Sequence, residues 1–185
     1  MATATATPLL TAEEYANLPD PGVPQELVRG TIVTMPVPGR RHGYVCMRVG
    51  RILGDFVESR DLGRLFSNNT GVITGRSPDT VRGADVAYYS FARLPKGPVP
   101  DGVGPEIPEL VVEVRSPSDR WREVQAKVSE YLKAGVLAVV VLDPDSETGH
   151  VFTSDDPPRT LAASDDLVLP GVLEGFRVPV GRFFE

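Results

Sequence analysis

The sequence predicts a mixed α/β domain whose central sheet is largely antiparallel. Several short segments alternate apolar and polar residues and are separated by turn residues, whereas two longer segments repeat apolar residues at helical spacing. The strand–helix–strand order over residues 110–142 is typical of a crossover between parallel strands. The chain has 185 residues, 41% of them hydrophobic. We therefore expect residues 1–9 to be flexible and residues 10–185 to form a single domain with a full core.

The N-terminal part is expected to contain a short helix, a hairpin and a longer helix. Thr11-Ala12-Glu13-Glu14 has the pattern of a capping box, which predicts a helix to about Leu18. Residues 26–35 are typical of a hairpin that turns at Arg29-Gly30. Apolar residues then recur at helical spacing over 42–58, which predicts an amphipathic helix.

The rest of the chain is expected to form strands around one further helix. The expected strands are 64–67, 71–74, 83–89, 109–115, 136–142, 150–153, 167–169 and 176–178. Either Ser118 or Asp119 can cap a helix that runs to about Lys133. The apolar strand 136–142 is expected at the centre of the sheet and 150–153 at its edge. Residues 93–108, with five prolines and three glycines, are expected to form a long loop.

Composition excludes several classes of protein. The single cysteine, Cys46, excludes an internal disulfide framework and a zinc site built of several cysteines, and we expect it to be a small buried residue. No run of about 18 apolar residues is present, so no membrane-spanning helix is expected. The first ten residues lack a basic segment and an apolar core, so no secretion signal is expected. A cytoplasmic protein fits these observations best.

The net charge of −6 is unevenly distributed. Residues 1–142 carry 16 acidic and 16 basic side chains, whereas residues 143–185 carry nine acidic and three basic ones. The body of the protein is therefore electrically balanced, which permits a local basic face without showing one. A dedicated high-affinity DNA-binding protein would be more basic.

Four ionisable residues occur where structure alone does not favour them. Glu113 lies inside an apolar strand, where a carboxylate is costly to bury unless something binds it. Glu26 lies just before a hairpin strand, and Asp85 lies at the start of another strand. Lys127, one of three lysines in the chain, borders the apolar stripe of its helix.

These four residues can assemble the chemistry of phosphodiester hydrolysis. Carboxylates on neighbouring strands, here Asp85 and Glu113, can hold one Mg²⁺ or Mn²⁺ that activates water and neutralises charge on phosphorus. Lys127 can orient or deprotonate that water, and Glu26 can be an extra ligand or acid/base. The alternative is structural, because strand-end carboxylates often pair with arginine, here Arg115 or Arg82.

Several motifs together resemble the Uma family of "putative restriction endonucleases", a branch of the PD-(D/E)XK nuclease superfamily. The resemblance covers about residues 10–185 and depends on these segments: Glu26–Gly30, Arg82–Ala87, Leu110–Asp119, Lys127–Val136, Val140–Pro144 and Leu169–Gly171. It implies a restriction-endonuclease-like core, with a central four-stranded mixed sheet flanked by helices. It also implies a Mg²⁺-dependent nuclease site with Asp85 as the motif aspartate, Glu113 as the second acid and Glu26 as the helix-proximal acid.

The sequence departs from the superfamily motif at two positions. Ala84 precedes Asp85 where the motif has proline, and Arg115 stands where the motif has lysine. Arginine cannot serve as a base, so we expect Lys127 to be the functional lysine and Arg115 to contact phosphate or pair with Glu113. Arg82 and His42 are further candidate substrate contacts.

The resulting hypothesis is an endonuclease that uses Mg²⁺ or Mn²⁺ to hydrolyse DNA, and a homodimer is expected because cutting both strands needs two sites. The alternative is a nuclease-like fold without turnover that binds nucleic acid or protein. It is favoured by the acidic C-terminal part of the chain and by the absence of the motif proline and strand lysine.

Overall fold

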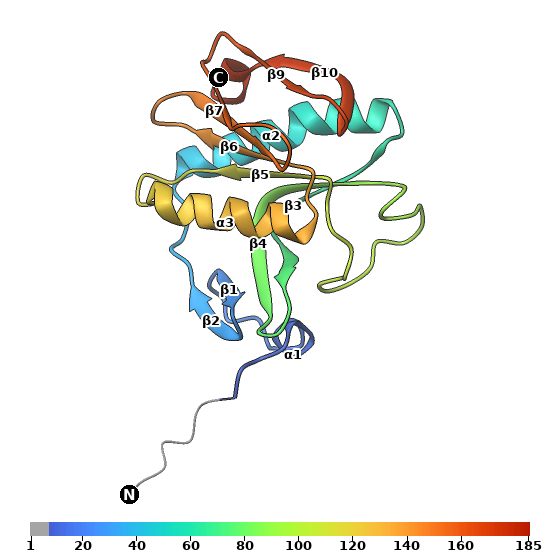
Figure 1. The fold of residues 1–185 in the computed structure, drawn as a ribbon, viewed down its shortest axis with the longest axis vertical. Helices are drawn as coiled ribbons and strands as arrows, with labels where there is room; N and C mark the ends of the chain where they lie inside the picture. Colours follow the sequence, from blue (N-terminus) through green and yellow to red (C-terminus); the bar gives the residue numbers. More distant parts are fainter. Residues whose placement is uncertain (1–7) are drawn as a thin grey trace, which may run out of the picture.

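The computed structural model describes residues 8–185 and has the mixed α/β architecture that the sequence predicts (Figure 1). The elements are α1 (Ala12–Ala16), β1 (Gln25–Val28), β2 (Thr31–Thr34), α2 (Arg40–Ser59), β3 (Gly63–Gly75), β4 (Thr80–Ser90), β5 (Leu110–Val114), α3 (Trp121–Ala134), β6 (Ala138–Asp143), β7 (Thr148–Thr153), β8 (Arg159–Leu161), β9 (Asp166–Leu169), β10 (Leu173–Pro179) and the short 3-10 helix η1 (Val180–Phe183). None of these helices is long and apolar enough to cross a membrane.

The main sheet has eight strands in the order β2-β1-β4-β5-β6-β7-β8, with β3 paired to β4. Only β5 and β6 are parallel, and α3 connects them as predicted. The segment β3-β4-β5-β6 is the mixed four-stranded core that the resemblance implied. The observed sheet is larger because the β1–β2 hairpin extends it on one side and β7 and β8 on the other.

Two helices cover opposite faces of this sheet (Figure 1). The apolar stripe of α2, made of Val45, Val49, Leu53 and Val57, packs against alternate residues of the strands, among them Val112. The other face carries Val111, Val139 and Val141, which pack against α3 through Val128 and Tyr131. Because successive residues of a strand point to opposite faces, the apolar strands β5 and β6 can fill both layers.

Three local predictions were wrong in detail. The two short strands expected before residue 75 are one strand, β3, which bends where Asn68 and Asn69 adopt positive φ. The predicted edge strand is interior, because β7 pairs with β8 as well as β6. Neither Ser118 nor Asp119 caps α3, because the helix is preceded by Arg120, which makes no side-chain cap. The carboxylate of Asp119 accepts a hydrogen bond from the N–H of Ser116.

The N-terminal helix α1 lies beside the β1–β2 hairpin, which is the part of the main sheet drawn lowest in Figure 1. Thr11 and Glu14 form the predicted capping box. Ala12 then packs beside Leu27 and Val81, and its N–H donates to Asp79, 2.8 Å away. The prediction of a flexible terminus concerns mainly residues 1–7, which lie outside the described part of the chain. Helix α1 therefore packs against the hairpin, and the hairpin lies next to the site described below.

Candidate active site

Asp85 on β4 and Glu113 on β5 face each other across neighbouring strands. The two strands are antiparallel, with Val86 opposite Val112 and Ala87 opposite Val111. One step further in this register places Asp85 opposite Glu113, and directly opposed residues share a face of the sheet. The N–H of Val114, next to Glu113, also donates to Oδ2 of Asp85 at 2.8 Å. The pairing of two strands therefore brings the two predicted metal ligands together.

Glu113 is held by two side chains from α3. Its Oε2 accepts from Nζ of Lys127 at 2.9 Å, and its Oε1 accepts from the hydroxyl of Tyr131 at 2.8 Å. Burial is the largest influence on this carboxyl and raises its pKa to about 7, and the charge of Asp85 acts in the same direction against the opposing effect of Lys127. Glu113 therefore titrates near neutral pH, unlike an ordinary glutamate.

Lys127 points into the site and connects three strands. Besides Glu113, its ammonium group contacts Oε1 of Glu26 on β1 at 3.1 Å and donates to the carbonyl of Gly83 on β4 at 2.9 Å. Burial alone would lower the pKa of Lys127, but the carboxylates of Glu113 and Glu26 outweigh that effect and raise it. Lys127 is therefore a permanently charged donor under physiological conditions.

Glu26 belongs to an ion-pair network with Arg82. The guanidinium of Arg82 donates to Oε2 of Glu26 at 2.7 Å and makes two contacts with Glu130 on α3, at 2.6 and 3.0 Å. The N–H of Gly83 donates to the other oxygen of Glu26 at 3.0 Å. Burial raises the pKa of Glu26, yet Lys127 and Arg82 together lower it overall. The arginine is thus already occupied by carboxylates.

The buried cluster carries more negative than positive charge. Its carboxylates are Glu26, Asp85, Glu113 and Glu130, and its permanent cations are Arg82 and Lys127. The net charge is −2 only when Glu113 is ionised and His42 is neutral, and a proton on either group makes it less negative. Burying such an excess is unfavourable unless a cation compensates it. The donor set of carboxylate oxygens fits a hard divalent ion.

One expectation was that Arg115 pairs with Glu113, and the structure shows a different partner. Arg115 follows the last residue of β5, and its guanidinium donates to Asp143 at the end of β6, 2.9 Å away. A second donor reaches the carbonyl of Asp119 at 3.3 Å. Because β5 and β6 are parallel, their ends lie side by side, which gives Arg115 a nearer carboxylate than Glu113.

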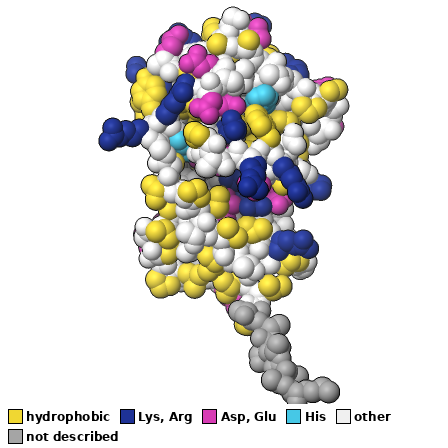
Figure 2. Space-filling view, turned by 90° about the vertical axis from the view of Figure 1, so that its left-hand side faces the viewer, with side chains coloured by type: hydrophobic (Ala, Val, Ile, Leu, Met, Phe, Trp, Pro, Cys, Tyr) yellow, Lys and Arg dark blue, Asp and Glu magenta, His cyan; other side chains and the backbone are white. Residues whose placement is uncertain are grey.

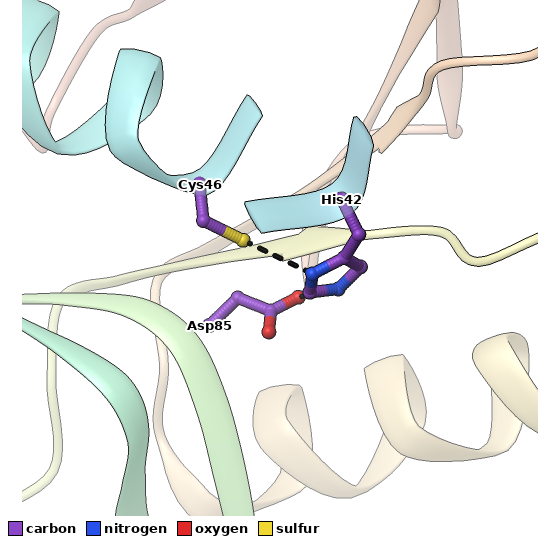
Figure 3. Close-up of side chains that lie close together, drawn as sticks. All are labelled: His42, Cys46 and Asp85. Carbon is purple, nitrogen blue, oxygen red and sulfur yellow. Dashed lines mark hydrogen bonds and ion pairs between the residues drawn. The ribbon is translucent and has the colours of Figure 1, made fainter. Parts of the chain in front are cut away.

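His42 lies in the site rather than on the surface. It is on the first turn of α2, and its Nε2 is 3.2 Å from Oδ2 of Asp85. Its Nδ1 is 3.5 Å from Sγ of Cys46, one turn further along the helix (Figure 3). Burial tends to lower the pKa of His42, but the hydrogen bond and charge of Asp85 raise it overall.

Two adjoining cavities open onto these groups. The smaller, of about 90 Å³, is lined by His42 and Asp85 as well as by the shared wall residues Glu26, Glu113 and Lys127. The larger, of about 420 Å³, shares that wall and extends along Arg82 and Arg115. Figure 2 shows this side of the molecule. Basic and acidic side chains gather across its middle and upper parts, and the lower part is largely apolar.

The site includes residues that sequence reasoning missed. Tyr131 was not among the predicted site residues, although its position four residues after Lys127 places both on one face and could have linked them. Glu130 was not considered at all. Cys46 was assigned to the core, although its spacing of four from His42 was a usable signal.

Comparisons with known proteins agree with this fold. The Uma2 family model, described as "Putative restriction endonuclease", matches residues 12–181. A solved structure described as a "putative nuclease belonging to DUF820", from Anabaena variabilis ATCC 29413, superimposes with a TM-score of 0.83. That chain is 19% identical, and the match covers 95% of this chain and 97% of the other. At this identity the likeness shows the fold. A search of curated proteins found no match.

Proposed function

The chain belongs to the Uma2 family, which is described as "Putative restriction endonuclease", and from this premise we propose that it is a metal-dependent endonuclease that hydrolyses DNA phosphodiester bonds. The observation that carries the proposal is the arrangement of Asp85 and Glu113 on opposed strands, with Lys127 hydrogen-bonded to Glu113 at the wall of a cavity. The family and the fold support the nuclease class, and the arrangement of these residues supports the chemistry.

Asp85 and Glu113 would hold Mg²⁺ or Mn²⁺. When bound, such an ion supplies an activated water and neutralises charge on the phosphorus. Hydrolysis joins the water oxygen to phosphorus and breaks one phosphorus–oxygen bond to a sugar, and the leaving oxygen takes up a proton. Lys127 remains charged, so in this proposal it orients the water and contacts the phosphate instead of removing a proton. Glu26 positions Lys127, because both of its oxygens are already engaged.

DNA is the substrate that the surroundings of the site favour. Helices α2 and α3 both begin beside the cavities, and helix N-termini attract phosphate groups. Exposed basic residues stand at those two starts: Arg40, Arg41, Arg120 and Arg122. Phosphate contacts of this kind position a nucleic acid without reading its sequence.

The second candidate is a nuclease-like fold that binds nucleic acid or protein without turnover. The specific observation in its favour is Arg115, which replaces the motif lysine and pairs with Asp143. On this alternative, the cluster around Lys127 would be a structural ion-pair network, and no divalent ion would bind between Asp85 and Glu113.

Calorimetric titration of Mn²⁺ separates the two candidates. The endonuclease proposal expects binding in the wild type that is lost in Asp85→Ala. The control is Asp55→Ala, an equivalent change at an exposed position of α2, which should bind as the wild type does. Cleavage of supercoiled plasmid in Mg²⁺ or Mn²⁺ should then follow the same pattern. No binding to the wild type at millimolar Mn²⁺ would reject the proposal.

We also propose that the active form is a homodimer. Cleavage of both DNA strands requires two sites, and the sheet has open edges at the short strand β8, at the hairpin strand β2 and along β3, which pairs only with β4, and these edges need cover. Sedimentation equilibrium should give the mass of two chains at working concentration, whereas the mass of a single chain would reject this arrangement.

A further inference from the structure

Three potential metal ligands of different chemistry converge behind the proposed hard-cation site. His42, Cys46 and Asp85 each offer one ligand atom, and these atoms all lie within 4.8 Å of one another. Figure 3 shows that His42 and Cys46 come from consecutive turns of α2 and point toward Asp85 on β4. Residues four apart share one face of a helix, so the histidine and cysteine form a ready-made pair of ligands.

The chemistry of this set differs from that of the Asp85–Glu113 pair. A thiolate, an imidazole and a carboxylate are the ligands that Zn²⁺ prefers, whereas Mg²⁺ prefers oxygen alone. Three protein ligands leave a fourth position of a tetrahedral ion for water. Zn²⁺ also binds such mixed ligand sets more tightly than Mn²⁺ or Fe²⁺ does, in keeping with the general order of divalent ions.

The electrostatic surroundings favour a cation at this position. The carboxylates of Asp119 and Glu113 act on His42 in the same sense as Asp85 does, so negative charge surrounds the imidazole. Binding of Zn²⁺ by Cys46 displaces the thiol proton, which passes to solvent.

We propose that His42, Cys46 and Asp85 form a binding site for Zn²⁺, and that filling it inhibits the enzyme by withdrawing Asp85 from the hard-cation site. The inhibitory part rests on the function proposed above, because it requires that Asp85 also holds Mg²⁺ or Mn²⁺. The binding part does not depend on it. Because both sites use the carboxylate of Asp85, Zn²⁺ at one site and Mg²⁺ or Mn²⁺ at the other compete with each other.

Titration with Co²⁺, a spectroscopic substitute for Zn²⁺, tests the binding part. Because Cys46 is the only cysteine of the chain, a thiolate-to-Co²⁺ charge-transfer band in the reduced wild type can arise only from this residue. We expect such a band, saturating at one Co²⁺ per chain and abolished by added Zn²⁺. His42→Gln should weaken Co²⁺ binding at least about tenfold. Absence of the band, or unchanged affinity in His42→Gln, would overturn the proposal.

Competition between the two metals tests the inhibitory part. Mn²⁺ titrated into wild type loaded with one equivalent of Zn²⁺ should bind at least about tenfold more weakly than to the metal-free protein, because Asp85 is engaged. In Cys46→Ala, one equivalent of Zn²⁺ should weaken Mn²⁺ binding less than it does in the wild type, because the thiolate ligand of the Zn²⁺ site is gone. Equal Mn²⁺ affinity with and without Zn²⁺ would refute shared use of Asp85. If the wild type binds no Mn²⁺ at all, the endonuclease proposal fails, while the Co²⁺ band still decides whether the Zn²⁺ site exists.

Discussion

Replacing Lys127 with methionine should strongly destabilise the protein. The ammonium group contacts Glu113, Glu26 and the carbonyl of Gly83, all within 3.1 Å. The Lys127 side chain is only 19% exposed, and the Glu113 and Glu26 side chains are 13% and 4% exposed. Methionine fills a similar volume, so the change removes a charge without leaving a large cavity.

The expected loss lies at the lower end of the range for a broken buried ion pair, which is about 3–5 kcal/mol. Glu26 retains Arg82 and the N–H of Gly83, and Glu113 retains Tyr131 and can take up a proton. We therefore expect a loss of about 3 kcal/mol in the free energy of unfolding. For a chain of this size, that corresponds to a fall of about 6–12 °C in Tm.

Urea denaturation at pH 8 with chelator present measures this loss, because Glu113 of the wild type is then mostly ionised and paired with Lys127. The matched control is Lys133→Met, an exposed position on the same helix, where we expect a change within about 0.5 kcal/mol. Adding Glu113→Gln to Lys127→Met should recover part of the stability, since the unpaired charge disappears. If Lys127→Met behaves like Lys133→Met, the buried-charge account of the site is wrong.

Three further predictions concern stability. Folding raises the pKa of Glu113 from 4.5 to about 7, so the stability contributed by its protonated form is fully present below about pH 4.5 and is lost as the pH rises through 7. Between pH 5 and 8 the free energy of unfolding of the metal-free wild type should therefore fall by about 2 kcal/mol relative to that of Glu113→Gln. Parallel plots of unfolding free energy against pH for the two proteins would refute this. Tyr131→Phe removes a hydrogen bond to Glu113 and should cost about 1.5–3 kcal/mol by urea denaturation, whereas a neutral effect would mean that the bond contributes nothing. Gly63→Ala would place a Cβ 2.1 Å from the carbonyl oxygen of Tyr89, so β3 must shift, and thermal unfolding should show a loss of about 1–3 kcal/mol; an unchanged Tm would show that the strand adapts freely.

Local sequence signals were sufficient for most of the elements of this fold. The capping box at Thr11, the hairpin turn at Arg29-Gly30 and the apolar spacing of α2 each act within a few residues, so the chain carries them without tertiary context. The same signals could not tell that β3 continues through Asn68 and Asn69, because its continuation depends on pairing with β4. They also left β7 at the edge, since β8 has only three residues and no distinct pattern.

Two residues of the site, Glu113 and Lys127, were also predictable from local sequence. A charged residue within an apolar strand or beside an apolar stripe requires a partner, and that requirement is readable for Glu113 and Lys127 from the sequence alone. The family motifs added Asp85 and Glu26. Strand pairing then decided that Asp85 lies opposite Glu113, which no local pattern specifies.

The sequence by itself therefore determined the class of fold, most of its helices and strands, and the ionisable residues that need a partner. Only the tertiary structure decided which partner each one has. Arg82 pairs with Glu26 and Glu130, and Arg115 pairs with Asp143, because strand order and register bring together residues that are 28 to 56 positions apart. The attraction between opposite charges depends on the distance between them, and that distance is set by the folded structure.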